Sequence, residues 1–279
     1  MNIRSEPIKI LSYNLHLGLS AFRKRAIEER LIQTILREQC DIVMLQELWI
    51  PEDAVILSFL DHLQEELEHR ICGPTVKFAT GIQGNGLLSC FPIVKWRNQT
   101  LLESSKNQPR AILHADVQMD DGGQLALICT HFGLTHRERL EHARELAEYI
   151  HEHVPRETPL IVAGDFNDWP CKLSRFFLRE LGLAEIFKST LGRHQRTFPA
   201  ILPMFCLDRI YARGFTVQDA RVVHEAGWFG SSDHLPLAAT LLLQAAPSVS
   251  PHALESFSPI PDPSRSPDRK VPGFPGDGR

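Results

Sequence analysis

The chain has 279 residues, 43% of them hydrophobic. This is enough to bury the core of one large domain, which we expect by default, or of two small ones. Its formal net charge of -4 gives no overall attraction to a polyanion, which disfavours tight, sequence-independent binding of long nucleic acids. No secretory signal pattern opens the chain and no apolar stretch is long enough to cross a bilayer, so we expect a cytoplasmic protein.

Short apolar runs recur along the chain, and their length and β-branched content favour strands over helices. The predicted strands are residues 8–13, 42–45, 87–89, 111–117, 125–130, 160–163, 210–212 and 237–243. An Asp- and Gly-rich turn separates the fourth and fifth of these runs, which predicts an antiparallel hairpin.

Helical patterns lie between some of the strands. Residues 23–40 and 137–154 place apolar side chains at three-and-four spacing, and the second pattern ends before Pro155. Residues 53–69 give a weaker third helix. Because helices alternate with strands while some neighbouring strands form hairpins, a purely parallel sheet is disfavoured. We therefore predict an α/β fold, a four-layer α-β-β-α sandwich of two mixed, largely antiparallel sheets with outer helices.

The composition changes near Ala245, which predicts a domain boundary. Residues 246–279 are rich in Pro, Ser and Gly and have neither helical nor strand periodicity, so they cannot bury enough apolar surface to offset their ordering entropy. We expect one folded domain over residues 1–245, followed by a disordered tail.

The six cysteines stand singly, without the paired spacing of a zinc site or the density of a disulfide scaffold. We expect them to be small core hydrophobes in a reducing compartment.

Polar residues follow or flank many of the predicted strands. They are Asn14, Glu47, His131, Asp165, Asn167, Asp208, Asp233 and His234. Each has an ordinary explanation when taken alone, as a turn former, a solvated strand end or a hydrogen-bonded histidine. Together they favour a site, because a folded core tolerates few uncompensated carboxylates.

The donor types indicate the chemistry. Carboxylate and amide oxygens without clustered thiolates suit Mg²⁺, with Mn²⁺ as an alternative, better than zinc. Hydrolysis of a phosphate ester needs a cation, neutral donors to the phosphoryl oxygens, an oriented water and a histidine held by a carboxylate. The set of residues therefore predicts a phosphate-ester hydrolase.

The ordered motifs SYN, LQE, THFG, GDFND, LDRIY and SSDH resemble those of the endonuclease/exonuclease/phosphatase superfamily, in the manner of a small standalone bacterial member. The stretch GNGLLSCFPI is also similar to a strand of that family, with Cys90 where a basic residue is common. The resemblance spans about residues 8–243.

By this resemblance, the metal would be held by Glu47, Asn14 and Asp233. The phosphate would be bound by Asn167, Asn14 and His131. The catalytic residues would be His234, Asp165, Asp208 and His131. His234 would be oriented by Asp208, while Asp165 would orient or activate the attacking water, and Asp165 and His234 are joint candidates for the general base.

The substrate is less determined than the reaction class, because one fold serves many chemistries. We favour a phosphodiesterase or phosphatase acting on a small or lipid-linked phosphate, in a monomer with peripheral membrane contact left open. The runner-up is a DNA or RNA nuclease, and an inactive scaffold is the alternative from another class. Trp169 is expected to be a packing or rim residue, and Arg110 either a phosphate contact or a solvated loop residue.

Overall fold

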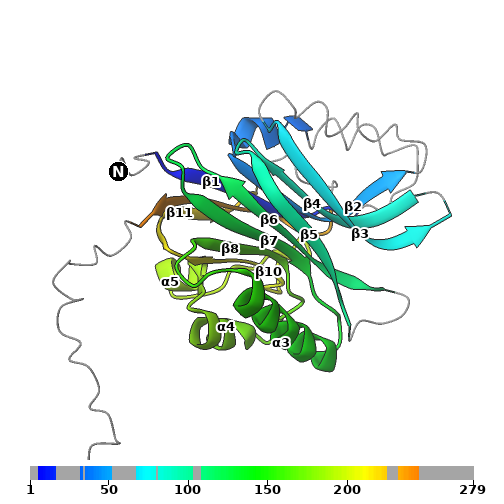
Figure 1. Ribbon diagram of the computed structural model, residues 1–279. Helices are drawn as coiled ribbons and strands as arrows, with labels where there is room; N and C mark the ends of the chain where they lie inside the picture. Colours follow the sequence, from blue (N-terminus) through cyan, green and yellow to red (C-terminus); the bar gives the residue numbers. More distant parts are fainter. Residues whose placement is uncertain are drawn as a thin grey trace, which may run out of the picture. The chain divides into compact units, whose positions relative to one another are not determined.

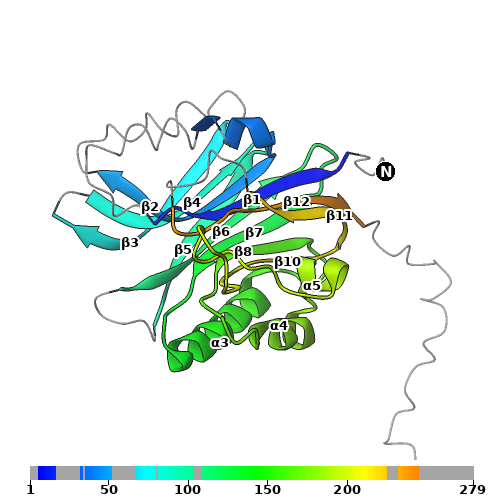
Figure 2. The same cartoon turned by 180° about the vertical axis from the view of Figure 1, so that it is seen from behind.

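The computed structural model describes residues 6–16, 32–33, 35–51, 67–79, 81–102, 108–224 and 232–244. They form two six-stranded sheets packed face to face (Figures 1 and 2). In spatial order, the first sheet contains β11 (Phe215–Val222), β12 (Leu237–Leu243), β1 (Ile8–Asn14), β2 (Ile42–Pro51), β4 (Gly81–Ser89) and β3 (His69–Phe78). The second contains β5 (Ile93–Leu101), β6 (Arg110–Gln118), β7 (Gln124–His131), β8 (Leu160–Asp165), β10 (Asp208–Arg213) and β9 (Ala184–Glu185).

Each sheet has one parallel pair of strands among antiparallel neighbours. β1 pairs with β2 in parallel, and β7 pairs with β8 in parallel. The predicted hairpin of β6 and β7 is antiparallel, and its turn contains Gly122 in a left-handed conformation. The predicted class of two mixed, largely antiparallel sheets is therefore confirmed.

The alternation of side chains along the strands builds the core. In β7, Leu125 and Leu127 pack between the two sheets, whereas Ala126 and Ile128 face the helices on the outside. β1 divides in the same way, with Ile10 directed to the inter-sheet core. Both faces of these strands are covered, which explains why they are continuous apolar runs rather than alternating ones.

Two helices, α3 (His136–His153) and α4 (Leu173–Leu181), pack on the outer face of the second sheet, on the side away from β1 (Figures 1 and 2). The short helix α5 (Ile186–Leu191) instead buries Ile186 and Phe187 in the core between the sheets. α3 begins with a capping box, in which Thr135 and Glu138 satisfy each other's backbone N–H groups, and it ends before Pro155 as predicted. Its apolar face packs on β6, β7 and β8 and covers the outer face of this sheet.

The structure extends and corrects the predicted elements. All eight predicted strands are present, while β3, β5, β9, β11, α4 and α5 were not predicted. Residues 32–33 and 35–38 are helical, as the pattern over 23–40 predicts, and the rest of its amphipathic part lies outside the described residues. For the helix predicted over 53–69, residues 53–66 lie outside them too, and its end is wrong, since His69 begins β3. The tail predicted over 246–279 also lies outside them.

The cysteines are less buried than predicted. Cys129 is buried between the sheets, whereas the other five are half-buried, and all six are free thiols. The prediction of core hydrophobes holds for Cys129, and for Cys40, Cys72 and Cys90, which are partly buried against the core, but not for Cys171 and Cys206. Within the described residues, no helix has the length and apolar character needed to cross a bilayer.

Candidate active site

The pairing of strands in the second sheet brings three predicted site residues to one level. Asp165, the last residue of β8, lies opposite His131 on β7 and opposite Asp208 on β10. The glycine before Asp165 permits this approach, because a Cβ at Gly164 would lie 1.8 Å from the carbonyl oxygen of Thr130. The glycine of the GDFND motif is thus required by packing. It allows the Asp165 carboxylate to lie between the neighbouring strands β7 and β10.

The first sheet contributes Asn14 and Glu47. Asn14 ends β1, and its side-chain amide donates to Asp165 Oδ2 at 3.0 Å, which connects the two sheets. Glu47 was expected just beyond a strand end, but it lies inside β2, where the register with β4 shifts between Leu45 and Leu48. Its φ of 54° is in the left-handed region, so the irregularity re-aims the carboxylate toward the site.

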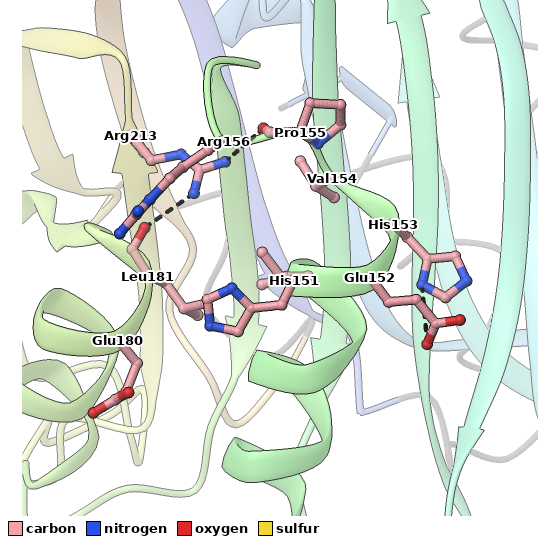
Figure 3. Close-up of a pocket in the computed structure, with 10 residues that line it drawn as sticks. His151, Glu152, His153, Val154, Pro155, Arg156, Glu180, Leu181 and Arg213 are labelled. Atoms are coloured by element: carbon pink, nitrogen blue, oxygen red, sulfur yellow. Dashed lines mark hydrogen bonds and ion pairs between the residues drawn. The ribbon is translucent and has the colours of Figure 1, made fainter. Parts of the chain in front are cut away.

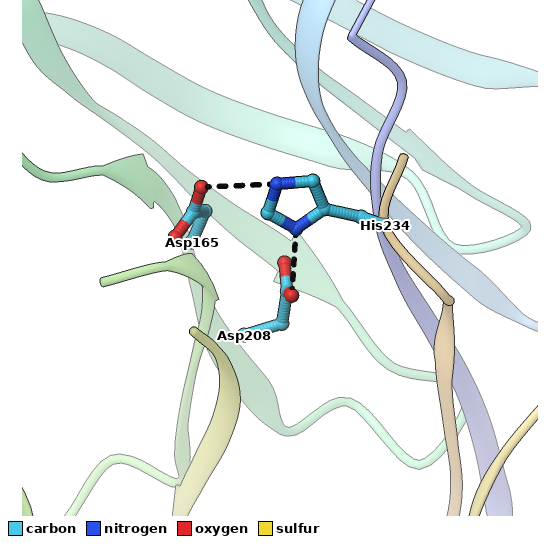
Figure 4. Close-up of side chains that lie close together, drawn as sticks. All are labelled: Asp165, Asp208 and His234. Carbon is cyan, nitrogen blue, oxygen red and sulfur yellow. Dashed lines mark hydrogen bonds and ion pairs between the residues drawn. The ribbon is translucent and has the colours of Figure 1, made fainter. Parts of the chain in front are cut away.

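His234 lies between two carboxylates (Figure 4). Its Nδ1 is 2.8 Å from Asp208 Oδ2, and its Nε2 is 3.8 Å from Asp165 Oδ2. Thr197 donates its hydroxyl to the same Asp208 oxygen, which fixes that carboxylate from a second direction. The predicted orientation of His234 by Asp208 therefore has the geometry it requires, with the far imidazole nitrogen directed at Asp165.

Burial and charge act on these groups in opposite directions. Burial alone would lower the pKa of His234, but the carboxylates of Asp208, Asp165 and Asp233 raise it to about 10. Burial raises the pKa of Asp165 above its ordinary value, and the nearby His234 charge opposes that rise. At neutral pH this arrangement favours an imidazolium at His234.

His131 bridges the acids of the two sheets. Its Nδ1 is 3.6 Å from Glu47 Oε1, and its Nε2 is 3.4 Å from Asp165 Oδ2. The Asn167 amide lies 3.2 Å from the same Nε2 and donates to the carbonyl oxygen of Phe132. Burial and the positive charge of Arg110 hold the pKa of His131 well below its ordinary value, so this imidazole is neutral.

The carboxylates of Glu47 and Asp233 both lie close to the His16 imidazole. The Nδ1 atom of His16 is 3.5 Å from Glu47 Oε2 and 3.7 Å from Asp233 Oδ1. Burial would raise the pKa of Glu47, but hydrogen bonding from His16 and nearby positive charge, that of Arg110 included, lower it to about 2. Two carboxylates directed at one imidazole, with the Asn14 amide nearby, are hard oxygen donors that fit a divalent cation.

A second group of ligand-type atoms lies close by. Asp165, Asp208 and His234 each offer an atom within 4.8 Å of the others. In this group the Asp208 oxygen is already bonded to both Thr197 and His234, which suits proton handling better than metal binding. The Glu47 and Asp233 end is therefore the better candidate for a cation.

Several residues of the site were not singled out in the sequence. His16 contacts both Glu47 and Asp233, Gln83 donates to Glu47 at 3.0 Å, and Ser232 donates to the backbone oxygen of Asn14 at 2.7 Å. The proximity of His16 to the SYN motif was the one available signal. Arg110 is buried rather than a solvated loop residue, while Trp169 is 59% exposed and lies at the rim.

The contacts form one continuous network. Glu47 reaches His131, His131 reaches Asp165, and Asp165 reaches both Asn14 and His234. The sequence-predicted residues, which come from both sheets and from the loop before β12, are thus brought together at one end of the sandwich.

A hollow of about 430 Å³ lies elsewhere, at the opposite ends of β8 and β10 (Figure 3). It is lined by the C-terminal turns of α3 and α4 together with Arg156 and Arg213. Asp165 and Asp208 are at the other ends of the same two strands, so this hollow is separate from the predicted chemistry.

Comparison with known proteins identifies the family. The sequence profile of the endonuclease/exonuclease/phosphatase family matches residues 11–234. The chain belongs to this family. A family relative in Escherichia coli, the uncharacterized protein YbhP, is 30% identical over 248 residues, which cover 84% of this chain and 96% of that protein.

Solved structures share the family fold. The catalytic domain of human nocturnin, solved with a bound sulfate anion, has a TM-score of 0.66 at 21% identity, covering 88% of this chain and 96% of that one. The mannosyl-6-phosphatase Bt3783 of Bacteroides thetaiotaomicron has a TM-score of 0.66 at 20% identity, covering 85% of this chain and 100% of that one. At these identities the likeness concerns the fold.

Proposed function

We propose that the protein is a magnesium-dependent hydrolase of phosphate esters, acting as a phosphodiesterase or phosphatase. The observation that carries this proposal is the arrangement of Asp208, His234 and Asp165 beside the convergent carboxylates of Glu47 and Asp233. The family's description names endonucleases, exonucleases and phosphatases, which all cleave phosphate esters. We assign the catalytic domain to residues 1–245, which contain the matched segment.

Glu47, Asn14 and Asp233 would hold the cation. When bound, it would neutralise charge on the phosphoryl oxygens and position the phosphate. Their donor chemistry supports this role, since the pKa of Glu47 is low enough for the carboxylate to stay ionised at any physiological pH.

The remaining residues of the site would either bind the phosphoryl oxygens or transfer protons. Asn167 and neutral His131 would donate to phosphoryl oxygens. Asp165 lies between His131 and His234 and would accept the proton of the attacking water. His234, kept positively charged by Asp208, would donate from Nε2 to the charge that develops at phosphorus. This division favours Asp165 over His234 as the base.

The test uses the purified chain stripped of metal with EDTA. We expect hydrolysis of bis-para-nitrophenyl phosphate to appear on addition of Mg²⁺ or Mn²⁺, with plasmid and oligonucleotides left intact. Rapid plasmid nicking that is lost at high salt would instead support the nuclease alternative. If no phosphate ester is cleaved with either metal, the hydrolase proposal fails and the scaffold alternative takes its place.

A further inference from the structure

Exposed apolar side chains gather on the loops around the candidate active site. Twelve large hydrophobic side chains are exposed among the described residues, and six of them lie on three loops next to the ends of β7, β8 and β10. Those six are Leu134, Trp169, Ile201, Leu202, Met204 and Phe205. Single exposed hydrophobics need no explanation, but a group concentrated at the rim of one site indicates a contact surface.

The densest part is a hairpin, which we call the apolar hairpin and define as residues 198–205. Phe198 and Phe205 pair across it, and the Leu202 N–H donates to the carbonyl oxygen of Pro199. Ile201 at its tip is 90% exposed and Leu202 is 67% exposed. Since the hairpin's own backbone bonds hold it in shape, the apolar tip faces solvent without any unfolding.

The apolar hairpin is directly attached to the catalytic residues. The N–H of Ala200 donates to the carbonyl oxygen of Asp233 at 2.7 Å, and the ring of Phe198 lies 5.0 Å from that of His234. Thr197, at the base, is the residue that donates to Asp208. A surface that docks on this hairpin is therefore brought to the mouth of the site.

The two other loops join the same rim. The buried Arg209 guanidinium donates to the carbonyl oxygens of Cys206 and Asp168, which connects the base of the hairpin to the turn that carries Trp169. Arg139 lies over the Trp169 ring at 5.9 Å and donates to the carbonyl oxygen of Leu134. The exposed apolar residues are thus connected by contacts around one side of the site.

The charge next to these loops is positive, although the chain as a whole carries -4. Residues 169–179 and 192–207 contain no Asp or Glu. Four exposed basic residues in them lie toward the loops, namely Lys172, Arg175, Arg193 and Arg196, whereas Arg179 pairs with Glu180 in the last turn of α4. Apolar side chains flanked by exposed basic ones are the combination that binds an anionic membrane surface, where the apolar groups enter the acyl boundary and the cations meet headgroups.

We propose that the apolar hairpin and the Trp169 turn dock the protein on an anionic phospholipid bilayer, so that its substrates are phosphate esters at a lipid surface. The choice of substrate rests on the proposed function, whereas the docking does not. The absence of acids from both segments is what favours a bilayer over an uncharged apolar partner.

The test is cosedimentation of the full chain with vesicles. We expect binding to vesicles of phosphatidylcholine and phosphatidylglycerol in equal parts, and weak binding to phosphatidylcholine alone. The double variant Ile201→Ser/Leu202→Ser should lose about tenfold or more in affinity. The matched control Val94→Ser/Leu102→Ser, at exposed apolar positions outside the three loops, should bind as the wild type does. Arg193→Gln/Arg196→Gln should weaken binding and reduce its dependence on salt.

Hydrolysis of bis-para-nitrophenyl phosphate separates docking from catalysis. Both serine variants should retain wild-type turnover of this water-soluble ester and wild-type circular dichroism. Docking is refuted if the wild type does not bind the anionic vesicles, or if the hairpin variant binds them equally well. Vesicle binding without hydrolysis of any ester would leave docking standing and overturn the proposed function.

Discussion

The two ends of β8 and β10 differ in how their charged groups are satisfied. At the catalytic end, Asp165 and Asp208 are held mostly by other titratable or polar side chains, with His234 between them. At the far end, the Arg213 guanidinium donates to the carbonyl oxygens of Leu181, Pro155 and Thr158 at 3.0 to 3.3 Å. One pair of strands thus has the candidate active site at one end and a structural brace at the other.

Backbone strain follows the same division. Four of the five described non-glycine residues with positive φ lie at or beside the site: His16, Glu47, Asn167 and Cys171. Such conformations are costly and persist where the surrounding structure over-determines them. The strained backbone at the catalytic end thus serves to position side chains of the site. The rest of the fold must supply the stability that compensates for this strain.

The largest expected effect lies at the catalytic end. Glu47→Gln, Asp165→Asn and His234→Ala should each lower turnover of a phosphate ester by about a hundredfold or more, because each removes a charged group from the reaction. Steady-state kinetics with Mg²⁺, together with circular dichroism to check the fold, makes the measurement. Near-normal turnover in two of the three variants would refute the roles assigned here.

A pH effect on stability should follow from His234. Its pKa is raised in the folded protein to about 10, against 6.5 ordinarily, so its contribution is fully present below pH 6.5 and is lost as pH rises toward 10. The free energy of unfolding without metal should fall over this window by on the order of several kcal/mol.

Urea unfolding in EDTA at a series of pH values measures this loss. In Asp208→Asn, the decline should still begin near pH 6.5 but end at lower pH, because the main carboxylate that raises the pKa of His234 in the folded protein is gone. An unfolding free energy in the wild type that is flat across this range would contradict the assigned charge state.

At the far end of β8 and β10, we expect a smaller effect, on stability rather than on turnover. Arg213→Met should lower the free energy of unfolding by about 1–3 kcal/mol, since three carbonyl oxygens lose a charged donor. Turnover should stay unchanged. Urea unfolding measures the stability of this variant, and steady-state kinetics of the same preparation measures its turnover. A loss of activity with no loss of stability would contradict the contrast between the two ends of the strands.

The sequence predicted which residues gather at the candidate site better than it predicted the sheet edges. Asn14, His131 and Asp165 end apolar runs, so their position at strand ends was legible from local pattern alone. β5 was missed because its side chains are mostly exposed and give neither an apolar run nor a regular alternation. Glu47 was found by its motif, but the irregularity that carries it depends on pairing with β4, which no local pattern encodes.

The contacts of His16 and the apolar hairpin could not be predicted for a related reason. His16 acquires its role when the end of β1 meets residues from β2 and from the loop before β12. Residues 198–205 form an apolar stretch in which Pro199 and Pro203 argue against a core strand, and only the structure shows that its tip is exposed. Both depend on tertiary placement, whereas strand identity depends on local sequence.

The smallest predicted effect concerns thiol reactivity at the rim of the catalytic end. The hydrogen bond from Cys171 lowers the pKa of Cys206, burial opposes this, and Arg209 and Arg196 lower it further. Burial raises the pKa of Cys72, on β3 and also half-buried, to about 11. Iodoacetamide at neutral pH should therefore modify Cys206 about tenfold faster than Cys72, because the thiolate is the nucleophile.

Mass spectrometry of peptides from a labelling time course follows both sites in one sample. In Cys171→Ala the advantage of Cys206 should shrink, because the donor that stabilises its thiolate is gone, while Cys72 provides the internal control. Equal rates at Cys206 and Cys72 in the wild type would contradict the electropositive rim. Since that rim also supplies the basic residues of the proposed membrane contact, anionic vesicles should slow labelling of Cys206 and leave Cys72 unaffected.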